Sequence, residues 1–433
     1  MLNKRRPYAD IAQITVLCAL VLLSIFLTWQ IVLSPGAKSS SVQNSSDDAQ
    51  NLSQVFQPNQ VFNVTSNRKV ERLATASLTR STKLRQTLSK ATFRYNKTVP
   101  STNKDIEKLL TTPHSLVLRY NDRLPLAYFN ARYAQDMARD DVTFDYVVVP
   151  YMQFVNPRVY LVDSRAKSIT TLTAKNLHQQ IFTDELATLK AKDTQTVTFA
   201  VRSDRVQVTY PSAFSLPVYS YLVNTQDAHS YVNQLLGNYQ IHTTQKGDVI
   251  TYRNAGAQSL QVNADTRLLT FRDKSRQNTN LVDRLSASFA LLNLNGMDLS
   301  NIRYFEARDA GKSIVYRTFV RDWPVFYQAP NGAVQVTDDQ KLTAVYALDA
   351  LTTPVPNSQN DVTLPNTATI QKTLTAAGIS AKSYSDMTPG YQWQRQSAAS
   401  QVVDLTPVWV LQDAKTGEWE ALSEFIKRHQ GKG

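Results

Sequence analysis

The sequence predicts an α+β protein whose folded part follows a single N-terminal transmembrane helix. Residues 11–33 contain no acid or base, and short runs of β-branched and aromatic residues are interspersed with helix-like segments after residue 54. The order of elements in residues 214–322 is then repeated in residues 323–433, which predicts two small sheets, each covered by a helix. A composition of 42% hydrophobic and 19% charged residues is typical of folded, water-soluble domains.

The uncharged run 11–33 comes directly after a basic N-terminus that contains Lys4, Arg5 and Arg6. It exceeds the roughly 20 residues that a helix needs to cross the hydrocarbon layer. Because basic residues favour the cytoplasmic side, we expect residues 1–10 in the cytoplasm and everything after residue 33 outside the cell membrane. A cleaved signal peptide is the alternative, but its apolar region normally has only about 7 to 15 residues.

One face of the predicted membrane helix carries residues suited to contact a second helix. Small residues four positions apart allow close approach, and a glutamine can form a hydrogen bond across the contact. Trp29 is expected to anchor the helix at the outer membrane interface. A plain anchor without a partner is the alternative. The predicted contact residues are Gln13, Leu20, Ser24, Thr28 and Ile31.

The remaining chain is expected to form a linker and three folded units. Residues 34–53 are mostly Ser, Asn, Gln and Asp, a composition typical of a flexible linker. Residues 54–213 are predicted to form an N-terminal α+β ectodomain, and the two repeated α+β modules cover 214–322 and 323–433. The helices expected in the N-terminal domain are 68–90, 103–111 and 173–189.

The net charge of +12 is concentrated in one region. Residues 68–97 contain nine bases and a single acid, Glu71, and their apolar residues recur at near-helical spacing. This pattern predicts one or two amphipathic helices with a cationic outer face. Such a face is either simply solvated or binds an anionic wall polymer, lipid head groups or an acidic partner, whereas nucleic acid is not expected outside the cell. The bases are Arg68, Lys69, Arg72, Arg80, Lys83, Arg85, Lys90, Arg94 and Lys97.

Signatures of enzymes are scarce, so we expect no catalytic residue, metal or cofactor. The five histidines lack metal-ligand spacing, and 12 glycines provide no phosphate-binding loop. The only cysteine, Cys18, lies in the predicted membrane helix, so no disulfide can stabilise the ectodomain.

A penicillin-interacting serine enzyme is nevertheless an alternative. Ser-x-x-Lys occurs at 164–167 and at 101–104, Ser-x-Asn at 358–360, and Lys-Thr-Gly at 415–417, in the chain order of that enzyme class. However, the segment 415–417 is predicted at a hairpin turn, whereas the enzymes need it on a strand beside the cleft.

Several segments resemble the YycH (WalH) family in the same order over nearly the full length. Residues 23–31 are similar to the end of that family's membrane helix, and Gln57–Val61 to the beginning of its ectodomain. The other similar segments are 118–125, 323–326, Gly390–Tyr391 and 405–409, followed by Trp419.

This resemblance implies a fold with an N-terminal domain and two modules of related build. It also implies a non-enzymatic regulator of the WalK–WalR (YycG–YycF) two-component system, which controls cell-wall metabolism in low-GC Gram-positive bacteria. Such a protein acts with a YycI-like partner and the WalK sensor kinase through contacts of the membrane helix and ectodomain. The resemblance leaves open whether the kinase is inhibited or activated.

Overall fold

The computed structural model describes most of the chain after residue 45. The described residues are 46–430, apart from 75–77, 191–193, 203–204, 238–239, 276–277, 279, 295–298, 328–333 and 396–399. No helix within these ranges is long and apolar enough to cross a membrane. The segments 1–10 and 11–33 lie outside the described residues, as do Gln13, Leu20, Ser24, Thr28, Trp29 and Ile31.

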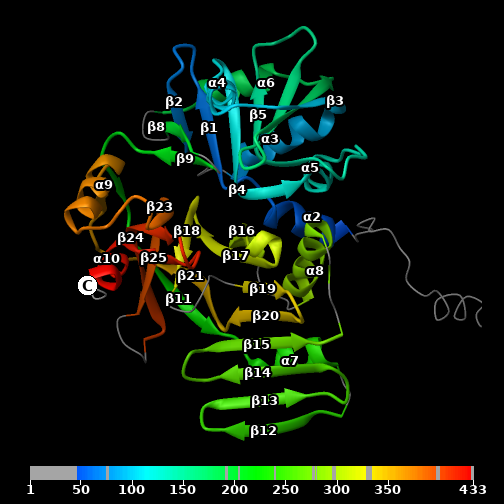
Figure 1. Ribbon diagram of the computed structural model, residues 1–433, viewed down its shortest axis with the longest axis vertical. Helices are drawn as coiled ribbons and strands as arrows, with labels where there is room; N and C mark the ends of the chain where they lie inside the picture. The colour runs from blue at the N-terminus through cyan, green and yellow to red at the C-terminus, as the bar shows by residue number, and fades with distance from the viewer. Residues whose placement is uncertain are drawn as a thin grey trace, which may run out of the picture. The chain divides into compact units, whose positions relative to one another are not determined.

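Residues 60–209 form a nine-stranded antiparallel sheet (Figure 1). Its strand β5 (Thr143–Pro150) is buried over almost its whole length, as expected for a strand covered on both faces. In spatial order the strands are β3 (Thr92–Pro100), β7 (Ser168–Lys175), β6 (Arg158–Asp163), β5 (Thr143–Pro150), β4 (Ser115–Pro125), β1 (Gln60–Val64), β2 (Val70–Leu73), β8 (Thr194–Val201) and β9 (Val206–Thr209).

The helices before residue 190 pack on both faces of this sheet. They are α2 (Ser46–Val55), α3 (Leu78–Lys90), α4 (Asn103–Leu110), α5 (Leu126–Tyr133) and α6 (Gln180–Ala187). Helix α4 begins with a capping box, because Asp105 N–H donates to Thr102 Oγ1 at 3.2 Å and Thr102 N–H donates to the Asp105 carboxylate at 2.8 Å. The helix expected over 103–111 is therefore confirmed.

Most strands after residue 213 belong to two groups, which are joined by a short hairpin of β17 (Ser313–Val320) and β18 (Trp323–Phe326). In the first group, helices α7 (Ala228–Leu236) and α8 (Leu281–Leu294) pack on antiparallel strands. The order is β12 (His242–Lys246), β13 (Val249–Arg253), β14 (Gln258–Asn263), β15 (Leu268–Asp273), β20 (Leu342–Ala347), β19 (Val334–Asp338) and β17 (Ser313–Val320), and β16 (Ile302–Arg308) also pairs with β17.

The second group begins with a parallel pair, β18 and β23. Its strands are β18 (Trp323–Phe326), β23 (Tyr384–Arg395), β24 (Val402–Asp413), β11 (Tyr219–Thr225) and β21 (Asp349–Val355), with β25 (Trp419–Ala421) beside β24. Strands β10 (Phe214–Leu216) and β22 (Val362–Leu364) form a separate pair. The helical elements here and near β16 are α9 (Thr367–Ala376), α10 (Leu422–Gln430), η2 (Leu299–Asn301) and η3 (Asp309–Gly311).

This pairing differs from the expected division into modules 214–322 and 323–433. Strands β19 and β20 come after residue 323 but pair with β17 and β15, whereas β11 comes before it and pairs with β21 and β24. Each group of strands is therefore completed by strands from the other segment. Alternating apolar residues show which face of a strand is buried, but they do not specify which distant strand lies beside it.

The N-terminal and C-terminal parts share their hydrophobic cores, so the core does not divide at residue 213. Phe56, directly after α2, is 1% exposed. Its ring centroid lies 4.3 Å from that of Tyr128 on α5, 5.9 Å from Phe289 on α8 and 5.5 Å from Tyr304 on β16. A second core joins α4 and the other sheet face to β18, β23 and β24.

The expected flexible linker 34–53 is wrong in its last part, because α2 begins at Ser46. Leu52, Val55 and Phe56 are spaced three and four residues apart and are all buried. Because the segment is polar on average, its composition did not indicate that a few apolar residues form one buried face.

Two of the expected helices begin later than expected, because a strand occupies the first part of each segment. The segment 68–90 contains strand β2 before helix α3, and 173–189 begins with the end of β7 before α6. Strand β2 pairs on both sides, with β1 and β8, and these backbone hydrogen bonds outweigh the near-helical spacing of its apolar residues.

Replacing Phe56 with alanine should reduce the free energy of unfolding by about 3–5 kcal/mol, because it leaves a cavity between aromatic rings from both parts of the fold. Urea unfolding of the purified chain measures this change. Phe154→Ala is the matched control, because Phe154 is 64% exposed and its truncation should change stability by no more than about 0.5 kcal/mol. Equal effects of the two substitutions would contradict the central position of Phe56.

Candidate functional site

A polar cavity of about 370 Å³ lies between the N-terminal sheet and the C-terminal strands. Strands β4 and β5 and the turn after β6 line one side, and β16, β23, β24 and the turn after β24 line the other. The described lining residues include six bases and six acids, so their formal charges cancel. The bases are Arg119, Arg123, Arg165, Arg205, Arg308 and Lys415, and the acids are Asp122, Asp145, Glu306, Asp309, Asp386 and Asp413.

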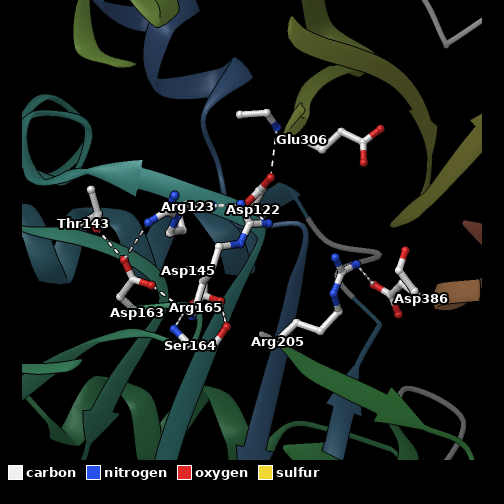
Figure 2. A network of polar contacts seen from close by, with 12 residues as sticks. Asp122, Arg123, Thr143, Asp145, Asp163, Ser164, Arg165, Arg205, Glu306 and Asp386 are labelled. Atoms are coloured by element: carbon white, nitrogen blue, oxygen red, sulfur yellow. Dashed lines mark hydrogen bonds and ion pairs between the residues drawn. The ribbon is translucent and has the colours of Figure 1, made fainter. Parts of the chain in front are cut away.

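Asp122 on β4 connects the two sides of this cavity (Figure 2). Its Oδ2 accepts a hydrogen bond from the backbone N–H of Ala307 on β16 at 3.0 Å, and its Oδ1 lies 3.3 Å from Arg165 Nη2. Nearby, the Tyr304 hydroxyl donates to the carbonyl of Arg123 at 3.1 Å. Because Asp122 is only 9% exposed, salt screens its interactions weakly. These contacts fix β4 to β16.

Two carboxylates hold the turn that follows β6 (Figure 2). Asp163 accepts hydrogen bonds from the N–H groups of Arg165 at 3.0 Å and Ala166 at 2.7 Å. Asp145 accepts one from Ser164 N–H at 2.9 Å and another from the Ser164 hydroxyl. Burial raises the pKa of Asp145 to about 7, although the hydrogen bonds from Ser164 oppose that rise.

Asp386 on β23 forms a second bridge to the N-terminal sheet. Its Oδ2 lies 3.5 Å from Arg205 Nη1 and 3.9 Å from Arg119 Nη2. Shorter hydrogen bonds hold both arginines, since Arg205 donates to Gln412 Oε1 at 3.0 Å and Arg119 donates to Gln60 Oε1 at 2.9 Å. The ion pairs with Asp386 therefore form between groups that neighbouring side chains already orient.

Glu306 on β16 is the central acceptor of a third cluster. It accepts hydrogen bonds from Arg308 Nε at 2.6 Å, Gln412 Nε2 at 2.9 Å and the Trp419 indole N–H at 3.0 Å. Burial raises the pKa of Glu306, whereas Arg308 and Arg317 act in the opposite direction. Three donors from β16, β24 and β25 thus hold this carboxylate in place.

Arg317 on β17 lies close to that cluster and is 2% exposed. Its guanidinium carbon is 4.7 Å from the ring centroid of Phe305 and 4.4 Å from that of Phe326. Burial lowers the pKa of Arg317 to about 9, and Glu306 opposes that shift. The two rings and Glu306 therefore stabilise a buried positive charge at neutral pH.

The arrangement around Ser164 does not match a serine nucleophile with a lysine base. The Ser164 hydroxyl donates to Asp145, and Lys167 Nζ donates to the carbonyl of Arg202 at 2.9 Å. The segment 415–417 lines the same cavity and forms the turn between β24 and β25, whereas 358–360 is not among the described lining residues. Within the described ranges, no cluster of three or more His, Cys, Asp or Glu residues could hold a metal ion.

The nine bases of residues 68–97 do not form the expected helix face, because they lie on β2, α3, β3 and the turn before β2. Arg72 is buried with its guanidinium 3.7 Å from the Trp323 ring centroid, and Arg85 is half-buried. Lys69 and Lys83 form ion pairs with Glu71 and Glu185. The exposed members are Arg68, Lys69, Lys83, Lys90, Arg94 and Lys97, and the side chain of Arg80 lies outside the described residues.

The sequence analysis predicted neither the polar cavity nor the acids that hold its walls together. Asp122, Asp163, Glu306 and Asp386 are isolated in the sequence, so neither charge runs nor motif spacing could indicate that they meet. Of the segments that the sequence analysis singled out, 118–125, 164–167 and 415–417 contribute lining residues, as does Trp419.

Comparisons with known proteins give two findings. The family model described as YycH protein, C-terminal domain, matches residues 213–430. Among solved structures, the crystal structure of YycH from Bacillus subtilis is similar with a TM-score of 0.65 and 13% sequence identity, over 86% of this chain and 96% of that chain. At this identity the structural likeness shows a shared fold, and it confirms the α+β class. No curated protein matched the chain.

The raised pKa of Asp145 predicts a pH-dependent stability. An unfolded aspartate ionises near pH 3.9, so the neutral form that the fold favours stabilises the chain fully below that pH. This contribution should be lost as the pH rises through about 7. Asp145→Asn should therefore flatten the pH dependence of the unfolding free energy by an amount on the order of a few kcal/mol between pH 4 and 8.

Urea unfolding at several pH values measures this difference. Asp309→Asn is the matched control, because Asp309 lines the same cavity but is exposed. A wild-type chain and an Asp145→Asn variant with parallel pH profiles would contradict the raised pKa.

Proposed function

The chain belongs to the YycH family, and from this premise we propose that it regulates the WalK sensor kinase from the outer face of the cell membrane. The observation that carries the proposal is the family membership itself, which gives a general role in the WalK system. The finer parts are a single membrane helix at 11–33 with the N-terminus in the cytoplasm, direct contact with WalK, and a YycI-like partner of the ectodomain.

The proposed regulation is non-enzymatic. Contacts around Ser164 support this view, because its hydroxyl is engaged by Asp145 while Lys167 donates elsewhere. A regulator that only binds can shift the kinase by no more than the difference between its affinities for the two kinase states. The proposed task of the chain is therefore to favour one arrangement of the kinase helices.

The position of α2 supports a mechanical connection between ectodomain and membrane. Helix α2 begins at Ser46, so only residues 34–45 separate it from the end of the proposed membrane helix. Leu52, Val55 and Phe56 attach α2 to the shared core. A partner that moves the ectodomain would therefore also move α2. Through residues 34–45, this movement would reach the end of the proposed membrane helix.

Deletion of the gene should change the phosphorylated fraction of WalR in cells. The full chain should restore the normal level, whereas residues 1–45 alone should restore only part of it, because the ectodomain contacts are missing. Phosphate-affinity electrophoresis measures the fraction, and immunoblots of membranes confirm equal amounts of both forms. If deletion leaves WalR phosphorylation unchanged, the proposed regulation of WalK is wrong.

Substituting Ser24 and Thr28 with leucine should weaken the effect on WalR phosphorylation while preserving the membrane level of the protein. The bulkier side chains would prevent close approach of a second helix on this face. Thr15→Leu is the matched control, because at about 100° per residue it lies on the opposite face. An equal effect of Thr15→Leu, or no effect of the double substitution, would refute the predicted contact face.

A further inference from the structure

A second cavity, of about 540 Å³, is lined by residues of α2, α3, α5 and β16 and of the turn between β17 and β18. Its described lining contains four arginines and a single acid, Asp322, an excess of three positive charges. The arginines are Arg85, Arg132, Arg303 and Arg321. We propose that this arginine-lined cavity binds a phosphate group, carried either by an anionic phospholipid head group or by a soluble phosphate ester.

Two of these arginines are largely buried and only partly satisfied by hydrogen bonds. Arg132 is 6% exposed, and its Nη1 donates to the carbonyl and hydroxyl oxygens of Ser53. Arg303 Nη2 donates to the carbonyl of Arg321 at 3.2 Å. The Nε atoms of Arg132 and Arg303 are buried and have no hydrogen-bond partner within the described residues. Phosphate oxygens are strong acceptors that match the guanidinium donor geometry.

Like charges are crowded around this cavity. Asp322 Oδ1 lies 3.6 Å from Arg303 Nη2 and compensates part of the excess. Burial lowers the pKa of Arg303, and Arg132 and Arg72 lower it further, against the opposing effect of Asp322. A bound anion would offset the repulsion and stabilise the charged form of Arg303.

Arg321 occupies a backbone conformation that favours glycine. It is the first residue of a two-residue loop between the paired residues Val320 and Trp323, and its φ is 58°. A side chain is disfavoured in this left-handed region. The exposed Arg321 side chain adds a positive charge to the cavity, and glycine could replace it without backbone strain.

The cavity is also close in sequence to the proposed membrane anchor, and this step depends on that anchor. Ser53 and Gln54 of α2 line the cavity. The twelve residues 34–45 can span at most about 43 Å, so they keep α2 within reach of the membrane surface. Phospholipid head groups are therefore an available source of phosphate.

Binding is tested on the full chain in a nonionic detergent, by following Tm while glycerol 3-phosphate is added at constant ionic strength. We expect a saturable rise in Tm that sodium chloride does not reproduce. Arg321→Gly and Arg85→Gln should weaken binding at least tenfold, and Arg321→Gly should not lower the Tm of the unliganded chain. Arg94→Gln, an exposed arginine on β3 outside the cavity, is the matched control and should bind as the wild type does.

The source of the phosphate is distinguished with water-soluble lipids. Tighter binding of dihexanoyl phosphatidylglycerol than of glycerol 3-phosphate supports a lipid head group, and equal binding supports a soluble phosphate ester. Failure of both ligands to bind, or an equal loss in Arg94→Gln, overturns the proposal. Either result is independent of WalR phosphorylation, so it leaves the proposed regulation of WalK unaffected.

Discussion

Burial of the Phe56 ring is the contact on which both parts of the fold depend. A fully buried phenylalanine contributes about 1.5–3 kcal/mol, and its aromatic neighbours add to this value. These neighbours come from α5, α8, β16 and β17, so they belong to segments on both sides of residue 213. Neither part can complete this core alone. The two C-terminal segments also depend on each other, because each group of strands contains strands from both segments.

The two cavities illustrate different uses of charge. In the polar cavity, acids and bases balance, and Asp122, Asp386 and Glu306 each engage donors that link separate strands. A ligand there would have to displace contacts that hold the fold together. The arginine-lined cavity has no such balance among its described residues. Crowded positive charges repel one another, and an anion can neutralise them. The first arrangement is therefore suited to cohesion and the second to binding.

The sequence predicts those elements whose signals are local. The helix expected over 103–111 is α4, whose first turn is capped by its own neighbours Thr102 and Asp105. The prediction is wrong for β2, whose conformation depends on pairing with β1 and β8. It is also wrong for α2, where a few apolar residues lie in a mostly polar segment. The cavities could not be predicted, because Asp122 and Ala307 are 185 residues apart and meet only through the packing of β4 against β16.

The cationic region has a structural role that its charge alone does not indicate. Arg72 lies over the Trp323 ring and donates to the carbonyl of Asp322 at 3.4 Å, and thereby ties β2 to the β17–β18 turn. That turn also carries Arg321 and borders the arginine-lined cavity, next to α2. An anion bound there would join α2, α5 and the turn through shared charge interactions. Because α2 is the element nearest in sequence to the proposed membrane helix, phosphate binding would strengthen the attachment through which we propose that the ectodomain acts on that helix.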